Sequence, residues 1–153
     1  MSIENKVTKR IICIGNRYNR DDAVGPKVYD ILMSKVLPHD VEVIDGGLSG
    51  LNLLRFIEGA ELVVFVDRVF GFGRPNEILI LKAKDAASRS EIRYDHSAGL
   101  PYLLRVLPEV CEGKVPNILL VAIEGNPEGW VIEKAAELAL KLTSQGKISD
   151  SSF

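Results

Sequence analysis

Five short apolar segments recur along the chain, and turn or helix signals separate them. They occupy residues 10–15, 41–47, 61–67, 76–83 and 117–125. Three of the five are continuous runs of valine, isoleucine and leucine without polar alternation, which is typical of strands buried on both faces of a parallel sheet. The pattern therefore predicts five strands.

Between these segments, apolar residues repeat with helical spacing. The repeats cover residues 23–36, 50–60, 99–110 and 131–144. In the first of them, Val24, Val28 and Leu32 share one face. Strands that alternate with helices through short connections favour right-handed βαβ units. We therefore predict an α/β fold, a three-layer sandwich in which helices cover both faces of a twisted, mostly parallel five-stranded sheet.

The strand at about 76–83 is the exception to the parallel pattern. It follows the segment 61–67 across a loop that is too short for a helical crossover, so we expect it to be antiparallel and to lie at or near an edge. The chain shows no internal repeat and no low-complexity linker. We expect a single domain over residues 1–153, with a polar tail at about 145–153 that frays.

Composition narrows the classes of function. The chain has 153 residues and is 46% hydrophobic, which is enough for one proper core, and its formal charge of -2 gives no basic field for nucleic acid. Its apolar runs are far shorter than the roughly 20 residues that span a bilayer, and no signal-peptide pattern follows the N-terminus. We expect a cytoplasmic protein with no nucleic-acid partner, no membrane insertion and no disulfide framework.

Acidic residues gather where the predicted parallel strands end. In an open α/β sheet, ligands bind beyond these carboxyl ends. The acids concerned are Asp21, Asp22, Asp45, Asp67 and Glu124. One imidazole joins them, because His96 lies in DHSAGL just before a predicted helix, whereas the other histidine, His39, precedes the second strand and belongs to the opposite end.

Each of these residues also has a structural explanation. Asp21 or Asp22 could cap the helix expected from Ala23, which is worth about 1 kcal/mol, and His96 could cap the helix expected near Ser97. Asp67 could hydrogen-bond a neighbouring loop or pair with the arginine that follows it. Carboxylates focused at one rim repel, however, unless a cation or a basic partner is bound.

Two aspartates and a histidine suit a divalent transition ion such as nickel, zinc or iron, with coordination positions left open. Other site signatures are absent from the sequence. It has no HExxH, no paired CxxC and no GxSxG, and neither GxGxxG nor GxxxxGK[ST] follows the first strand. Cys111 has no activating base in its neighbourhood of the sequence, which argues against a cysteine nucleophile.

The stretch GNRYNRDDAVGPKV resembles the opening motif GN-x4-D[DE]-x-[VI]-G of the hydrogenase maturation proteases. These endopeptidases trim a C-terminal extension from the large subunit of nickel-iron hydrogenases. The resemblance continues, in order, through VEVIDGGLSGLNLL, VVFVD, DHSAGLPYLL and LLVAIEG, so it covers nearly the whole chain. It implies a mostly parallel five-stranded sheet between helices, which agrees with the hydrophobic pattern.

The resemblance also implies a site. The family's metal-binding and catalytic residues match Asp22, Asp67 and His96. The ion that matters is the nickel already inserted in the large-subunit precursor, so the enzyme is expected to hold no tightly bound cofactor of its own. Cadmium or zinc is expected to substitute for nickel in crystals. The water that cleaves the peptide would be activated either as a metal-bound hydroxide or by an aspartate.

By the same resemblance, the groove for the precursor's C-terminal segment is bordered by substrate-binding residues from two loops. These are Asn16, Asp45, Gly46 and Gly47, with the glycines allowing close backbone approach. The expected partner is the precursor of a nickel-iron hydrogenase large subunit. The protein itself is expected to be a monomer or a weak dimer.

Two departures from the family pattern keep other functions open. Arg68 stands where the family carries a small apolar residue, and it could pair with Asp67 or Asp22. The stretch IEGNPEGW lacks a longer family segment, and it brings Trp130 towards the groove wall. An alternative is therefore a non-catalytic relative that binds a metalloprotein subunit without cleaving it. A third class, a small-molecule enzyme such as a nucleosidase, rests on fold analogy alone.

Overall fold

The computed structural model describes residues 6–19, 23–48, 50–71, 73–88, 93–94 and 99–144. The expected tail at 145–153 lies outside these residues. The strands are β1 (Lys9–Ile14), β2 (Val41–Gly47), β3 (Leu62–Phe70), β4 (Ile78–Lys82), β5 (Arg93–Tyr94) and β6 (Asn117–Glu124). The helices are α1 (Val24–Met33), the 3-10 turn η2 (Leu51–Leu53), α2 (Leu54–Ile57), α3 (Ala83–Ser88), α4 (Gly99–Val110) and α5 (Gly129–Ser144).

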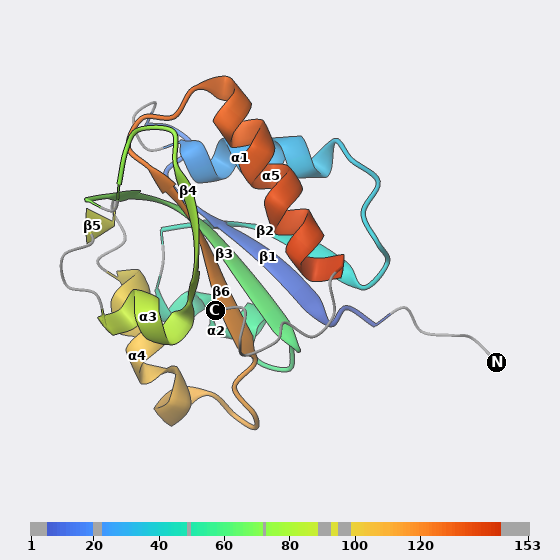
Figure 1. The fold of residues 1–153 in the computed structure, drawn as a ribbon. Coiled ribbons are helices and arrows are strands. Elements are labelled where there is room, and N and C mark those ends of the chain that lie inside the picture. The colour runs from blue at the N-terminus through green and yellow to red at the C-terminus, as the bar shows by residue number, and fades with distance from the viewer. Residues whose placement is uncertain are drawn as a thin grey trace.

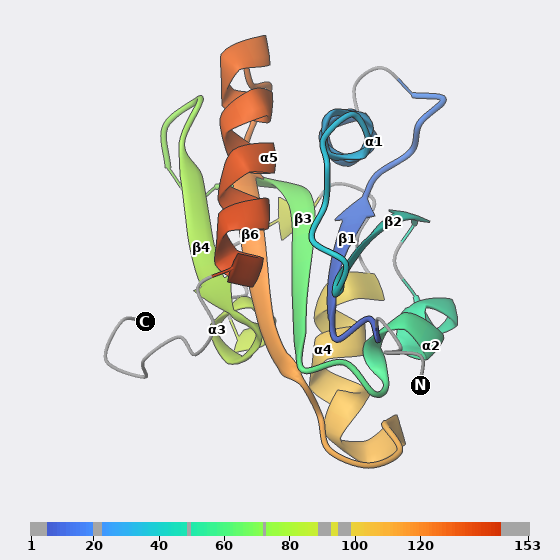
Figure 2. The same cartoon turned by 90° about the vertical axis from the view of Figure 1, so that its right-hand side faces the viewer.

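The sheet has the strand order β2-β1-β3-β6-β4, and β5 pairs with β3 outside this path. Strands β2, β1, β3 and β6 are parallel, whereas β4 runs antiparallel to β6 at the edge. Figure 2 shows this order across the sheet. The predicted α/β class, the mostly parallel sheet and the antiparallel edge strand are confirmed.

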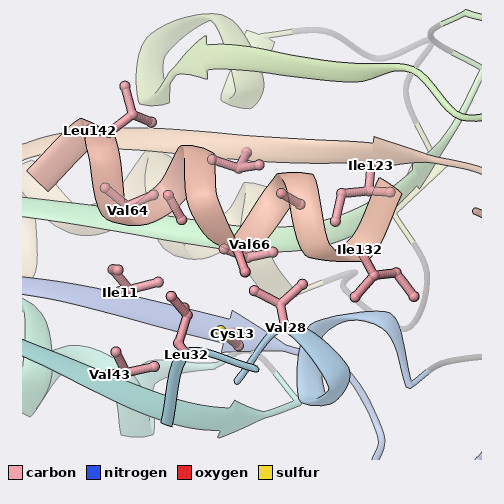
Figure 3. Close-up of a cluster of buried hydrophobic side chains, with 14 of the residues drawn as sticks. Ile11, Cys13, Val28, Leu32, Val43, Val64, Val66, Ile123, Ile132 and Leu142 are labelled. Atoms are coloured by element: carbon pink, nitrogen blue, oxygen red, sulfur yellow. The ribbon is translucent and has the colours of Figure 1, made fainter. Parts of the chain in front are cut away.

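Helices cover both faces of the sheet, as predicted (Figures 1 and 2). Helices α1 and α5 lie on one face over a core that includes Val28, Leu32 and Cys13, which is fully buried and packs as a small hydrophobe (Figure 3). The 3-10 turn η2 and helices α2 and α4 cover the other face, where Phe65 and Leu103 are fully buried. Successive side chains of each central strand point into one core and then the other, so both faces of the sheet are apolar.

Three elements differ from the sequence-based expectation, and one of them is β5, a two-residue strand that no apolar segment predicted. The strand expected to end at 67 continues to Phe70, because β3 keeps pairing with β6 and then with β5 beyond the polar residues. Helix α3 was not predicted; it is a six-residue helix that follows β4 directly, and it is too short to show a helical repeat in the sequence. None of the helices in the described part of the chain is long and apolar enough to cross a membrane.

The connections place a topological switch point between β1 and β3. From β1 the chain passes through α1 to β2 on one side, and from β2 it passes through η2 and α2 to β3 on the other side of β1. Neighbouring strands at such a point send their following segments in opposite directions, which leaves a crevice at their carboxyl ends. A ligand site is therefore expected at the carboxyl ends of β1 and β3.

Gly25 fixes the start of α1 against the end of β1. A Cβ atom at this position would lie 1.9 Å from the carbonyl oxygen of Ile14 and 2.6 Å from its carbonyl carbon. Both contacts are to backbone atoms, which cannot move aside as the end of a flexible side chain can. The first turn of α1 reaches the last residue of β1 only because residue 25 has no side chain.

We expect Gly25→Ala to destabilise the fold by about 3 kcal/mol, the upper end of the usual cost of overpacking. Gly129→Ala is the matched control, since it also changes a glycine at the start of a helix and its added Cβ meets no atom within 4 Å. That control should leave stability unchanged or raise it by up to about 1 kcal/mol. Urea unfolding followed by circular dichroism measures both, and equal midpoints for the two variants would contradict this account of the packing.

Candidate functional site

Asp67 is the predicted site residue that the structure places at the switch point. It is fully buried within β3, and its Oδ1 accepts a hydrogen bond of 2.8 Å from the backbone N–H of Arg68. Cys13 of β1 pairs with Val66 of β3, so β1 ends level with Asp67. The side chain of Asp67 shares a face with Phe65 and Val69, which belong to the core under α2 and α4.

The sequence predicts Asp67 as the last residue of the third strand, whereas in the structure the strand continues past it to Phe70. Asp67 pairs with Ala122 of β6 in the regular parallel register, three residues before β3 ends. A carboxylate inside a buried strand loses hydration and needs compensating contacts. The strand backbone holds its position more rigidly than a loop would, which suits a group that must face one point.

Arg68 lies on the opposite face of the sheet from Asp67, because successive side chains of a strand alternate. Its Nη1 donates a 2.7 Å hydrogen bond to Oδ1 of Asn126, and its guanidinium lies 4.9 Å from the ring centre of Phe70. The arginine that departs from the family pattern thus joins β3 to the loop after β6. The expected pairing of Arg68 with Asp67 is opposed by this alternation, and Asp22 lies outside the described residues.

The four residues predicted to contact substrate come together in one pocket. Asn16, Asp45, Gly46 and Gly47 line a hollow of about 390 Å³ at the carboxyl ends of β1 and β2. The same pocket is completed by Arg17, Tyr18 and Leu48. Residues from two separate segments therefore converge here, since β1 and β2 are parallel neighbours whose ends share one edge of the sheet.

The two glycines of this pocket serve different structural needs. At Gly46 an added Cβ would lie 2.8 Å from Cγ2 of Ile12 and 3.1 Å from Cδ1 of Ile14, so the glycine makes room for core side chains of β1. Gly47 has φ +60, a conformation that favours glycine, and an added Cβ would meet nothing within 4 Å. Only Gly47 leaves open space over its backbone.

Arg17, which sequence reasoning did not single out, connects α1 and β2 at the wall of the pocket. Its Nη1 and Nη2 donate to the two carboxylate oxygens of Asp30 in α1, both at 3.0 Å. Its Nε and Nη2 donate to Oδ2 of Asp45 in β2, at 3.2 and 2.9 Å. The guanidinium also lies 5.8 Å from the ring centre of Tyr29. No spacing rule links position 17 to positions 30 and 45, so only the folded chain shows this arrangement.

The Arg17 hydrogen bonds lower the pKa of Asp30, and the bonds to Asp30 and Asp45 raise the pKa of Arg17. Both effects favour the charged forms. The three side chains are substantially exposed, so water and salt screen the ion pairs and their contribution to stability is small. The arrangement holds the pocket wall in place more than it stabilises the fold.

Arg17→Gln should lower the urea midpoint slightly at pH 7, and the difference from wild type should shrink in acid. The pKa of Asp30 is depressed in the folded state, so its contribution is present above its unfolded pKa and disappears as pH falls through the folded value. Urea titrations at pH 7 and in the acid range measure this. A variant whose deficit stayed constant across that range would show that Asp30 is not the partner that matters.

Glu124 has a structural role at the same edge. Its carboxylate accepts hydrogen bonds from the backbone N–H groups of Gly71, at 3.2 Å, and Gly73, at 2.9 Å. These bonds hold the connection between β3 and β4 against the end of β6. The acid that the sequence placed at the end of the last strand is thereby engaged with the backbone, and its charge is stabilised by two aligned donors.

The other predicted metal ligands, Asp22 and His96, lie outside the described residues, as does Asp21. Among the described residues there is no group of three or more His, Cys, Asp or Glu side chains that could hold a metal ion. The N-cap position of α1 is occupied by Ala23, which makes no side-chain capping hydrogen bond. The predicted set of two aspartates and one histidine therefore stays a prediction.

A second pocket of about 390 Å³ lies at the other end of the sheet. It is lined mainly by apolar side chains from α4 and from the start of β6, including Leu104, Leu107 and Ile118, with Lys84 and Arg105 beside them. None of its described lining residues carries a carboxylate, hydroxyl or imidazole that could act on a substrate. We place the site at the carboxyl ends of the strands on chemical grounds.

Neither cysteine is prepared to act as a nucleophile. Burial raises the pKa of the Cys13 thiol, with Asp45 and Asp30 contributing further. Burial also raises the pKa of Cys111, and the carboxylates of Glu58 and Glu112 add to the effect. A thiol must ionise to attack, so both side chains are inert near neutral pH.

Iodoacetamide should therefore alkylate Cys111 more slowly than free cysteine at pH 8, with a rate that still rises above pH 9. Cys13 should stay unmodified in the folded protein, because it is fully buried. Mass spectrometry of the intact chain gives both rates, and the urea-unfolded chain, in which both thiols react, is the control. Rapid modification of either thiol at pH 7 would reopen a cysteine mechanism.

Comparison with known proteins identifies the family. A family model described as hydrogenase maturation protease matches residues 26–144, more than half of the chain. The chain belongs to the hydrogenase maturation protease family. The family identified from the motifs is thus confirmed.

Individual members of the family are distant relatives. The hydrogenase expression/formation protein HupD of Rhodobacter capsulatus is 34% identical over 77 residues, which are 49% of this chain and 36% of HupD. The hydrogenase 2 maturation protease of Escherichia coli K12 is 25% identical over 100 residues, 63% of this chain and 61% of that protein. The chain therefore matches less than two thirds of the length of either relative.

Solved structures of hydrogenase maturation proteases share the fold. The E. coli endopeptidase HybD superposes with a TM-score of 0.69 at 22% identity, covering 90% of both chains. HybD from Thermococcus kodakarensis gives a TM-score of 0.66 at 20% identity, covering 91% of this chain and 98% of that one. At this level of identity the likeness establishes architecture, and the chemistry must be argued from the side chains.

Proposed function

We propose that this member of the hydrogenase maturation protease family removes the C-terminal extension from the precursor of a nickel-iron hydrogenase large subunit after nickel has been inserted. The observation that carries the proposal is Asp67, a carboxylate fully buried at the switch point of the sheet in a chain of this family. The E. coli relative is named a hydrogenase 2 maturation protease, which supports the same substrate class.

In this proposal Asp22, Asp67 and His96 recognise the nickel of the precursor. Carboxylate and imidazole ligands suit this ion, and three protein ligands leave positions for the precursor's own ligands. A site of this kind binds a free ion weakly, because it is complete only when the precursor supplies the rest. Nickel is then part of the substrate, and it reports that the precursor is ready for cleavage.

The pocket beside β2 supplies the room for the peptide. Asp45 lies level with Val66, one residue from Asp67, and β1 stands between them. Strands lie about 4.8 Å apart, so the pocket and Asp67 are separated by about 10 Å. Three extended residues of a peptide span that distance. A segment seated among Asn16, Gly46 and Gly47 can therefore present a nearby bond to the carboxylate.

Cleavage adds water across the scissile amide bond. The attacking water needs a base to take its proton and a group to stabilise charge on the carbonyl oxygen. Asp67 can serve as a base or as a ligand that orients a metal-bound hydroxide, and the two routes remain alternatives. Both require its carboxylate in the charged form.

Incubation of the protein with a nickel-loaded large-subunit precursor, followed by mass spectrometry, tests the proposal. The precursor should lose its extension, and Asp67→Asn should slow cleavage by at least about 100-fold, the scale of a lost general base or ligand. Asparagine keeps an oxygen that can accept the 2.8 Å hydrogen bond from Arg68 N–H, so the fold should survive. Circular dichroism checks this.

Asp40→Asn is the matched control, because Asp40 forms a surface ion pair with Lys9 at the opposite end of β1. It should cleave at the wild-type rate, and nickel-free precursor should resist wild-type enzyme. Undiminished cleavage by Asp67→Asn would remove Asp67 from the mechanism. Stable binding of the loaded precursor without cleavage would favour the non-catalytic alternative. That alternative is suggested by Arg68, which departs from the family pattern and bonds to Asn126.

A further inference from the structure

The outer edge of β2 is the feature that the proposed function leaves unused. β2 is the terminal strand of the sheet and pairs only with β1 among the described strands (Figure 2). The backbone N–H of Lys9 donates to the carbonyl of Asp40 at 3.1 Å. In a parallel pair, alternate residues bond to the same neighbour, so Glu42 and Ile44 face β1 while Val43 and Asp45 turn their backbone groups outward.

These outward groups have no hydrogen-bond partner in the described part of the chain. Among the described residues, the one backbone hydrogen bond on this side is at the start of the strand, where the N–H of Val41 donates to the carbonyl of Pro38 at 3.1 Å. Val43 and Asp45 together leave two N–H donors and two C=O acceptors along the edge. Proteins usually protect such an edge with lysine, proline or a covering segment, and residues 43–47 contain neither residue.

The open edge leads directly into the pocket described above. Beyond Asp45 the strand ends in Gly46 and Gly47, and an added Cβ at Gly47 would meet open space. Three large apolar side chains stand exposed around this end of the strand: Tyr18 at 94%, Leu48 at 54% and Leu51 at 50%. An extended peptide can pair its backbone with the outward groups of β2 and pack its side chains against these exposed apolar residues.

Access favours this edge over β4, the other edge of the sheet, and local charge restricts which segment the edge can bind. Arg17 holds the carboxylate of Asp45 towards α1, which leaves Arg17, Asp30 and Asp45 with a net charge of -1 and disfavours an acidic segment. β1 ends level with Asp67, so a chain leaving β2 crosses no further strand residues on its way to it. β6, which separates β4 from β3, continues two residues past Ala122, the partner of Asp67.

We propose that the precursor's C-terminal segment binds as an added strand on the free edge of β2. It exchanges backbone hydrogen bonds with Val43 and Asp45 and rests apolar side chains on Tyr18 and Leu48. This inference rests on the proposed function, because it takes the occupant to be the substrate of the same site. Strand addition gives affinity through the backbone, and it holds the peptide extended so that the next residues reach Asp67.

Amide hydrogen exchange followed by NMR tests the proposal directly. The probe is a synthetic peptide of the C-terminal fifteen or so residues of the precursor used in the cleavage assay, in excess over the protein. The amides of Val43 and Asp45 should exchange at least tenfold more slowly with the peptide bound. The amides of Glu42 and Ile44 already face β1 and serve as internal controls that should not change.

Two variants provide a second measurement. Asp45→Pro removes the outward N–H without breaking a bond to β1, whereas Asp45→Ala keeps that N–H, and both lose the ion pair with Arg17. Peptide affinity should be about tenfold weaker in the proline variant than in the alanine variant, a difference that a side-chain role of Asp45 would not produce. Exchange protection of Glu42 and Ile44 in both variants shows that β2 still pairs with β1.

The outcomes separate this inference from the proposed function. Cleavage of the precursor together with unprotected Val43 and Asp45 amides, or with equal affinities of the two variants, would overturn strand addition and leave the protease proposal standing. A precursor that is neither bound nor cleaved would overturn both. Alternating protection along β2, with the predicted gap between the variants, supports both.

Discussion

The structure depends on how closely α1 approaches the end of β1. Gly25 lies against the backbone of Ile14, where any side chain would collide with the carbonyl group. This contact sets the chain's path away from the central strand at the level of Asp67 on the neighbouring strand. The crevice at the switch point, the buried carboxylate that borders it and the nearby pocket at the end of β2 all depend on where β1 stops.

The acids at this edge of the sheet are handled in three different ways. Asp45 is paired with an exposed arginine, Glu124 is satisfied by two backbone amides, and Asp67 is buried inside a strand. Asp67 and Glu124 are both kept away from bulk water, so their electrostatic interactions are less screened than those of Asp45, but only Asp67 is completely buried. Mutual repulsion among the acids is therefore reduced by local partners, and one carboxylate is set apart from the rest.

The same edge combines a rigid wall with an open one. On the side of β3 and β6, Glu124 and the Arg68–Asn126 bond hold the surrounding loops to the sheet. On the side of β2, backbone groups and apolar side chains face solvent, and Arg17 braces the wall from behind through α1. A site that binds an extended peptide needs one fixed side and one open side, because the peptide supplies the backbone and apolar contacts that the open side lacks.

The amino-acid sequence by itself determined the layers of this protein. Continuous apolar runs specify strands buried on both faces, helical repeats specify what covers them, and the short connection before 76–83 specifies an antiparallel neighbour. These are local properties, so they can be predicted from spacing alone. The family motifs likewise indicated candidate site residues in the sequence. Four of them, Asn16, Asp45, Gly46 and Gly47, line one pocket in the folded chain.

Tertiary structure alone decided what each charged group does. The extension of β3 through Asp67 and Arg68 comes from pairing with β5 and β6, which overrides the polar interruption in the sequence. Arg17 meets Asp30 and Asp45, and Glu124 meets Gly71, across separations in sequence that no periodic pattern encodes. A side chain's partner is fixed by where strands lie in the sheet, and that order follows from the packing of the whole chain.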